Sequence, residues 1–185
     1  MPSIIGTAHE SPGERLEHLA WLLNDLIYDL VTPSKVIRDY VSHPEFNPGS
    51  GQFLGIMRMC KISTVLAMTK LHDVIKNYGL EIRSFPDDVR DQTKLFMNYA
   101  QSRSLVRLRN KFVAHNFDDF SASSYSEGEV IFNGIFGQTV QDHMDLFQWV
   151  SPENPDQTYE KYHVSYLVTR MRNHVTSLVK PKPRV

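Results

Sequence analysis

Residues 52–78 read QFLGIMRMCKISTVLAMTKLHDVIKNY and form the most apolar segment of the chain. Apolar side chains recur along it at spacings of three and four, and further ones widen this stripe around most of a helix. One face carries Phe53, Met57, Cys60, Ala67, Leu71, Val74 and Tyr78. A helix that is apolar over most of its girth is buried on several sides, so this segment predicts the central helix of a bundle. Gly79 is expected to end it.

Amphipathic helices are predicted on both sides of the central segment. The first begins near Glu14 and carries one stripe of leucines, at positions 16, 19, 23, 26 and 30. Thr32 and Pro33 resemble an N-cap and a first helical residue, so this helix either kinks there or is followed by a second piece. Residues 43–51, with two prolines and two glycines, predict a loop.

The second half of the chain predicts two more main helices. One opens at Pro86 and runs through Leu95, Tyr99 and Leu105 to residue 115. The last has a cap at Asn154 and carries an apolar stripe of Val164, Leu167, Met171, Val175 and Leu178.

Residues 117–152, between these helices, are predicted to be an irregular insertion. The Asn-Gly pair within EVIFNGIFG (129–137) favours a small hairpin, and Val140, Met144 and Phe147 favour a short helix. Residues 180–185 are expected to be a flexible tail. The prediction is therefore one domain, residues 1–185, that is all-α: an antiparallel four- to five-helix bundle with a loop or hairpin insertion before the last helix.

Composition excludes several classes of protein. A net charge of −1 does not fit a globally basic nucleic-acid binder, so any contact with nucleic acid must use a local patch. No apolar run is long enough for a transmembrane helix, and the N-terminus lacks a secretory pattern, so we expect no membrane association and a cytoplasmic protein. The single Cys60 cannot form an internal disulfide, which fits a reducing compartment, and its apolar neighbours predict a core residue.

The stretch 102–116, SRSLVRLRNKFVAHN, is the most cationic part of the folded chain. On a regular helix Arg103, Arg107 and Lys111 share one face, while Leu105, Leu108 and Phe112 form the opposite face. Arg109 falls within the apolar arc. Because burying a guanidinium without a partner is costly, Arg109 must contact an anion: a carboxylate of this chain, a partner subunit or a ligand phosphate.

The residues around Arg109 have the chemistry for cleaving RNA without a metal. A histidine such as His115 transfers protons near neutral pH, and an arginine presents a fork of N–H donors to phosphate oxygens. Asn110 can orient a neighbouring side chain. Arg109, Asn110 and His115 are therefore the candidate catalytic residues, and Arg103, Arg107 and Lys111 the candidate RNA-binding residues.

The segment RNKFVAH (109–115) resembles the signature of the HEPN superfamily: an arginine, a polar residue directly after it, and a histidine four to six residues beyond the arginine. It is most similar to HEPN proteins of abortive-infection systems. The resemblance implies an all-α bundle of four or five helices and a metal-independent endoribonuclease of toxin–antitoxin or phage-defence type. It also implies a homodimer whose arginines and histidines line one cleft, RNA as ligand, and an antitoxin or nucleotidyltransferase as a further candidate partner. Members modified by a nucleotidyltransferase carry a tyrosine two residues after the histidine. Phe117 stands there, so that modification is not expected.

Other interpretations remain open. Arg109 can be a structural residue paired with an acid such as Asp118 or Asp73, with His115 as a helix cap, and the outer cations can be a solvated face. The chain can also be a non-catalytic HEPN-like module that binds a nucleotide or a protein. A metal-binding bundle would use histidines 18, 72, 143, 163 and 174, but no diagnostic spacing joins them, so neither a metal nor a cofactor is predicted.

The spacing of Arg109 and His115 also makes a geometric prediction. Six residues along a regular helix turn it by ~600°, which leaves the two side chains ~120° apart and ~9 Å apart along the axis. They can share one phosphate only if the helix ends or distorts between them, or if His115 comes from a second chain.

Overall fold

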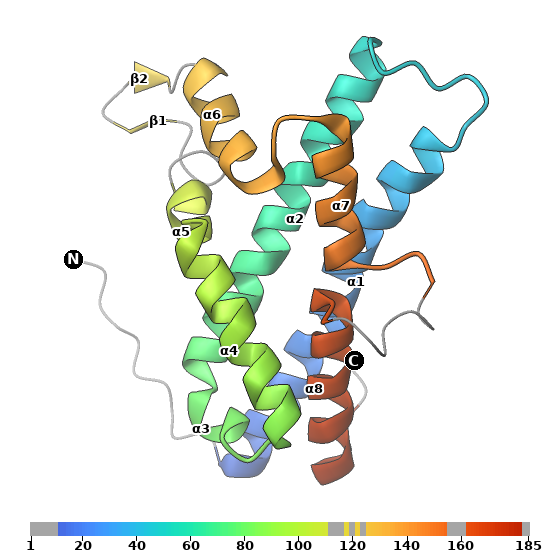
Figure 1. Ribbon diagram of the computed structural model, residues 1–185. Helices are drawn as coiled ribbons and strands as arrows, with labels where there is room; N and C mark the ends of the chain where they lie inside the picture. Colours follow the sequence, from blue (N-terminus) through green and yellow to red (C-terminus); the bar gives the residue numbers. More distant parts are fainter. Residues whose placement is uncertain (1–10, 111–116, 119–120, 123–124, 155–161, 183–185) are drawn as a thin grey trace.

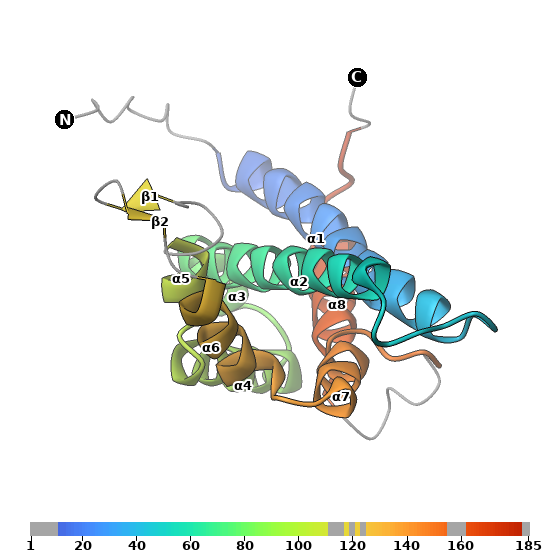
Figure 2. The same cartoon turned by 90° about the horizontal axis from the view of Figure 1, so that it is seen from above.

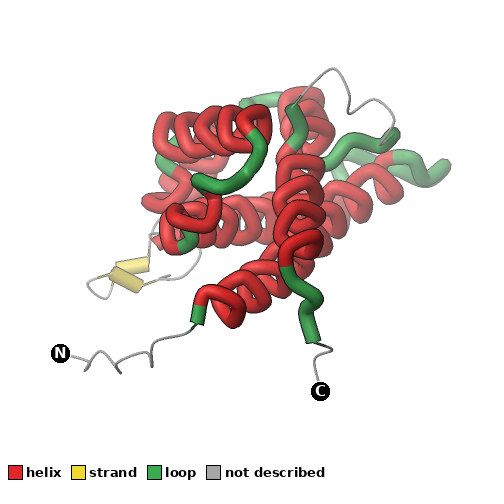
Figure 3. Tube along the Cα trace, turned by 90° about the horizontal axis from the view of Figure 1, so that it is seen from below, coloured by secondary structure: helices red, strands yellow, loops and turns green. Residues whose placement is uncertain are grey.

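The computed structural model describes residues 11–110, 117–118, 121–122, 125–154 and 162–182. Its helices and its single strand pair follow one another as α1 (Pro12–Val41), α2 (Gly51–Asn77), α3 (Gly79–Ile82), α4 (Asp87–Ser102), α5 (Leu105–Leu108), β1 (Phe117–Asp118), β2 (Ser121–Ala122), α6 (Tyr125–Phe136), α7 (Val140–Val150) and α8 (Val164–Leu178) (Figure 1). The fold is an all-α bundle, as predicted. The two-residue strands pair antiparallel at the margin of the helical body (Figure 3).

Helix α1 is continuous from Pro12 to Val41, so the predicted kink or handover at Thr32–Pro33 is wrong. Proline lacks the N–H that would continue the ladder, but the chain on both sides of it is anchored by packing. Leu30, Pro33, Ser34 and Ile37 are all buried along this part of the helix. The Ser34 hydroxyl also donates to the carbonyl of Leu30 at 3.3 Å.

Helix α2 holds the central position that its apolar sequence predicts. It packs against α1, α3, α4 and α5. Viewed from above, α4, α6 and α7 lie together on one side of it (Figure 2). Helix α2 ends at Asn77 with Tyr78 as its C-cap, so Gly79 follows the helix end as predicted, although it does not adopt a positive φ. Tyr78 interrupts α2 with φ −110°, and Gly79 is the first residue of the short α3.

Most of the segment predicted to be an irregular insertion, residues 117–152, is helical. Residues 129–137 do not form a hairpin, because residues 129–136 belong to α6. Phe132, Ile135 and Phe136 are buried, and their spacing of three and four suits one face of a helix. This periodicity outweighs the local turn signal of Asn133–Gly134. The change of direction comes later, at Gly137 with φ 82°, before α7 starts at its Thr139–Asp142 capping box.

The last helix, α8, begins at Val164 with His163 as its N-cap, so the cap predicted at Asn154 is wrong. Pro155, the predicted first helical residue, lies outside the described residues. Four of the five stripe residues of α8 are buried, and Leu178 is exposed. The apolar core joins residues of every helix longer than four residues and of α3 and α5 as well. Among the described helices, none has both the length and the apolar composition that crossing a bilayer requires.

Candidate functional site

The helix predicted to carry the cationic cluster is broken in two. Helix α4 ends at Ser102, and α5 starts at Leu105 after a turn in which Ser104 has φ 53°. Serine hydroxyls compete with the helical ladder, and here the Ser102 hydroxyl donates to the carbonyl of Tyr99 at 2.9 Å. The prediction of one continuous helix through this region is therefore wrong. Leu105 and Leu108 are nevertheless fully buried, as the apolar face predicts.

This break separates Arg103 from Arg107, so the predicted common face of the candidate RNA-binding cations does not form between these two residues. Arg103 lies at the end of α4, donates to the carbonyl of Gly134 in α6 at 2.8 Å, and packs over the ring of Tyr99. Arg107 is exposed on α5. Lys111 and His115 both lie outside the described residues.

Arg109 does contact an anion, and that anion is Asp73 of α2. Its Nη1 donates to Asp73 Oδ2 at 2.5 Å, and its Nε donates to the Oδ1 of Asn110 at 3.0 Å. The Arg109 side chain is 29% exposed, so the guanidinium is neither sealed in the core nor free on the surface. Asp73 was one of the two acids that the structural interpretation of Arg109 named. Asn110 orients the guanidinium, as its position in the sequence suggested.

The helix is wider than a regular α-helix at Arg109 and Asn110. Arg109 and Asn110 lie in a π-helical turn at the end of α5. Such turns are rare and occur frequently at functional sites. The predicted distortion further along, before His115, falls on residues outside the described part.

The other oxygen of Asp73 contacts a histidine. His72 Nδ1 lies 3.2 Å from Asp73 Oδ1, and the His72 side chain is 16% exposed. Partial burial raises the pKa of Asp73, but hydrogen bonds from Arg109 and His72, together with their charges, outweigh it and leave the pKa below its usual value. His72, Asp73, Arg109 and Asn110 thus form one connected polar cluster between α2 and α5.

The remaining histidines are dispersed. His18 is hydrogen-bonded to the Tyr78 hydroxyl, His163 to the Trp149 carbonyl, His143 to the Gly137 carbonyl, and His174 packs on the Phe85 ring. Within the described part of the chain, no three side chains of histidine, cysteine, aspartate or glutamate gather as metal ligands would. Cys60 is a buried core residue as predicted, and burial raises the pKa of its thiol to about 11.

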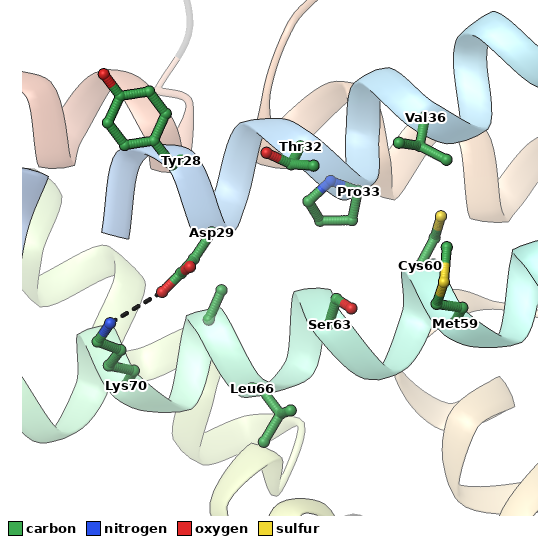
Figure 4. A pocket seen from close by; sticks show the side chains of 11 residues that line it. Tyr28, Asp29, Thr32, Pro33, Val36, Met59, Cys60, Ser63, Leu66 and Lys70 are labelled. Atoms are coloured by element: carbon green, nitrogen blue, oxygen red, sulfur yellow. Dashed lines mark hydrogen bonds and ion pairs between the residues drawn. The ribbon is translucent and has the colours of Figure 1, made fainter. Parts of the chain in front are cut away.

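A separate apolar groove runs along α1 and α2. It has a volume of about 520 Å³, and Tyr28, Pro33, Met59 and Leu66 line it between the Asp29–Lys70 ion pair and Val36 (Figure 4). None of the residues predicted for the site lines this groove. The apolar pattern of residues 52–78 predicted burial around most of α2, whereas Leu66, which lines the groove, is 42% exposed.

Comparisons with known proteins bear on the fold. No protein-family model and no curated protein matches the chain. Among solved structures, the chain is similar to integron cassette protein Vpc_cass2 from the mobile metagenome of V. paracholerae, with a TM-score of 0.72 and 21% sequence identity. The similarity covers 90% of this chain and 99% of the cassette protein. At this identity the similarity shows a shared all-α fold and nothing of the chemistry.

Proposed function

We propose that this chain is a HEPN-like protein that acts in the cytoplasm and cleaves single-stranded RNA by metal-independent transesterification, in a toxin or phage-defence role. The observation that carries the proposal is the placement of Arg109. Its guanidinium is oriented from two sides, by Asp73 at 2.5 Å and Asn110 at 3.0 Å, and stays partly exposed at the end of α5.

An arginine placed in this way suits a phosphodiester. Holding the guanidinium in one orientation removes much of the entropy loss that a flexible side chain would suffer on binding. The N–H groups not directed at Asp73 or Asn110 remain to bind phosphate oxygens and to stabilise the charge that develops on them. His115 is the proposed proton-transfer group, and Arg107, Arg103 and Lys111 are the proposed contacts to the RNA backbone.

The proposed assembly is a homodimer. One Arg109–His115 pair provides a single acid or base, while transesterification needs one proton removed and another delivered. A two-fold axis would bring two such pairs together. An antitoxin or a nucleotidyltransferase is the proposed further partner.

The experiment is a cleavage assay on single-stranded RNA in EDTA. We expect cleavage to persist without divalent ions and to leave a 2′,3′-cyclic phosphate, while DNA of the same sequence stays intact because it lacks the 2′-hydroxyl. Expression of the wild type should slow growth of the host, and expression of Arg109→Ala should not. Cleavage that stops in EDTA and returns with a divalent ion contradicts the proposal.

A non-catalytic HEPN-like binding module is the second candidate, and the Arg109–Asp73 pair favours it. The carboxylate neutralises the charge that an RNA phosphate would otherwise meet, so the pair can hold α5 against α2 and have no part in chemistry. RNA or nucleotide binding without cleavage, and without loss in Arg109→Ala, would support this candidate over the first.

A further inference from the structure

The apolar groove between α1 and α2 has the size and the walls of a small-molecule site. Its volume of about 520 Å³ lies within the roughly 300–1,000 Å³ that such sites occupy. Pro33 projects from α1 toward α2, and Cys60 projects from α2 toward α1 (Figure 4). Both residues are buried. The exposed apolar side chains that line the groove are Tyr28, Met59 and Leu66.

Pro33 removes one helical hydrogen bond from the wall of this groove. A proline has no N–H, so residue 33 donates nothing to the carbonyl of Asp29, four residues earlier in α1. Asp29 and Pro33 both line the groove. A donor from outside the helix can therefore bind this carbonyl.

Two hydroxyl groups in the groove also lack a bond that others in this chain make. Within helices, the hydroxyls of Ser34, Thr69 and Thr93 donate to the carbonyl four residues earlier, at 3.3, 2.9 and 2.8 Å. Thr32 of α1 and Ser63 of α2 line the groove, and neither hydroxyl bonds to any residue in the described part of the chain. Each of them can donate a hydrogen bond to a ligand and accept one.

One end of the groove carries both signs of charge. Asp29 Oδ2 accepts from Lys70 Nζ at 2.9 Å, and both side chains are partly exposed (Figure 4). A ligand carboxylate that binds Lys70 would also meet Asp29, and a ligand ammonium that binds Asp29 would also meet Lys70. A neutral group that both donates and accepts, such as a hydroxyl or an amide, complements both side chains without a like-charge contact.

A partner helix fits this face less well than a small molecule does. Lys35 and Asp39 form an exposed ion pair on α1, one and two turns beyond Thr32 and so on the same face. A helix laid along α1 would cover this pair as well as Asp29–Lys70, and burying ion pairs is costly. A small molecule can fill the groove and leave Lys35 and Asp39 in water.

We propose that the apolar groove binds a neutral amphipathic small molecule, which joins an acyl chain or a similar apolar body to a hydroxyl or amide group. Its apolar part contacts Met59 and Leu66. Its polar group forms hydrogen bonds at the Asp29–Lys70 end of the groove. The inference does not rest on the proposed function, because none of these residues belongs to the Arg109 cluster.

The test is a calorimetric titration of the whole chain with three ligands of one chain length: glycerol monodecanoate, decanoate and decylamine, each below its critical micelle concentration. Met59→Asp and Leu66→Asp place a charge on an apolar wall, and Thr32→Val removes a hydroxyl while keeping the shape. Leu95→Asp is the matched control, because Leu95 is an exposed leucine on α4, outside the groove. Circular dichroism checks that each variant is folded.

We expect the wild type and Leu95→Asp to bind one molecule of glycerol monodecanoate per chain. Both groove aspartate variants should bind it about tenfold or more weakly, because the apolar part of the ligand would then lie against a charge. Thr32→Val should bind it about three- to tenfold more weakly. Decanoate and decylamine should bind the wild type about tenfold or more weakly than the neutral ester does. These results together support the assignment.

Three results would overturn the assignment: no binding of the ester by the wild type, equal binding by the wild type and the groove aspartate variants, or tighter binding of the acid or the amine than of the ester. Sedimentation identifies another occupant, since a dimer that Leu66→Asp converts into a monomer, with no binding of the ester, would show a second copy in the groove. If an aspartate variant does not fold, Thr32→Val and the comparison of the three ligands still decide.

Discussion

Asp73 on α2 accepts a hydrogen bond from Arg109 at the end of α5, and this 2.5 Å contact joins residues 36 positions apart in the chain. It connects the central helix of the bundle to the arginine that begins the RNKFVAH segment. Both candidate functions depend on whether this pair serves structure alone or also orients a guanidinium for a phosphate.

The stability contributed by the pair should be small and dependent on pH. Both side chains are partly exposed, so Asp73→Asn should lower the free energy of unfolding at neutral pH by roughly 0.2–1 kcal/mol. Because the pKa of Asp73 is lowered in the folded state, this contribution is complete well above about 3.9, the ordinary value, and is lost as pH falls through the lowered one. Urea unfolding of both proteins across this range tests it. A difference that grows on acidification would contradict the ion pair.

Arg107 and Arg103 should contribute to RNA binding through phosphates. Replacing either by alanine should weaken binding to RNAs of any sequence and reduce the slope of log K against log salt by about 0.7. Lys94→Ala is the control, since Lys94 is an exposed cation on α4 that pairs with Asp91. Binding titrations at several salt concentrations measure the slopes. Equal effects from all three variants would indicate non-specific attraction.

The turn between α4 and α5 should respond to glycine in the opposite way to the helix before it. Ser104→Gly should raise the free energy of unfolding by up to about 1 kcal/mol, because a left-handed conformation costs an L-residue roughly 1–2 kcal/mol and costs glycine little. Part of this stabilisation is offset because glycine loses more conformational entropy on folding than serine does. Ser102→Gly, within α4, should instead lower the free energy of unfolding by about 0.5 kcal/mol. Destabilisation by both substitutions would argue for the uninterrupted helix.

The homodimer remains a prediction that sedimentation can test. We expect a dimer at micromolar concentration. If Arg109 of one chain meets His115 of the other, a mixture of Arg109→Ala and His115→Ala proteins should recover part of the activity that each lacks, since one composite site in the mixed dimer is intact. A protein that sediments as a monomer throughout would rule out the shared site.

The sequence predicts the helices well where periodicity and burial agree. The leucines of α1 from Leu19 to Leu30 are buried, and α8 follows its pattern up to the exposed Leu178. The face of α2 that runs from Phe53 to Tyr78 is buried as well, while Leu54, Met59 and Leu66 of the same helix are exposed. The prediction fails where a local signal is overruled by packing. Pro33 lies inside α1, and Asn133–Gly134 lies inside α6, because tertiary contacts on both sides stabilise the helix.

The site is predictable only in part. The inward position of Arg109 required an anion, and the structure provides Asp73. Which acid would serve depends on how α2 packs against α5, and spacing along the chain carries no such information. His72 was considered only as a weak metal ligand, and its contact with Asp73 was not predicted. The prediction that Arg103 and Arg107 share one helix face was wrong, because Ser104 adopts a left-handed conformation and the helix is interrupted between them.

The most direct test of the central claim is the rate of RNA cleavage in EDTA by Arg109→Ala and Arg109→Lys beside Arg172→Ala. Arg172 is a matched control, because its Nε donates to the next residue, Asn173, at 2.9 Å, as that of Arg109 does to Asn110 at 3.0 Å. We predict a loss of about 100-fold or more for both Arg109 variants, since lysine keeps the charge but not the fork, and a wild-type rate for Arg172→Ala. Equal rates in the wild type and the folded Arg109 variants would contradict the account.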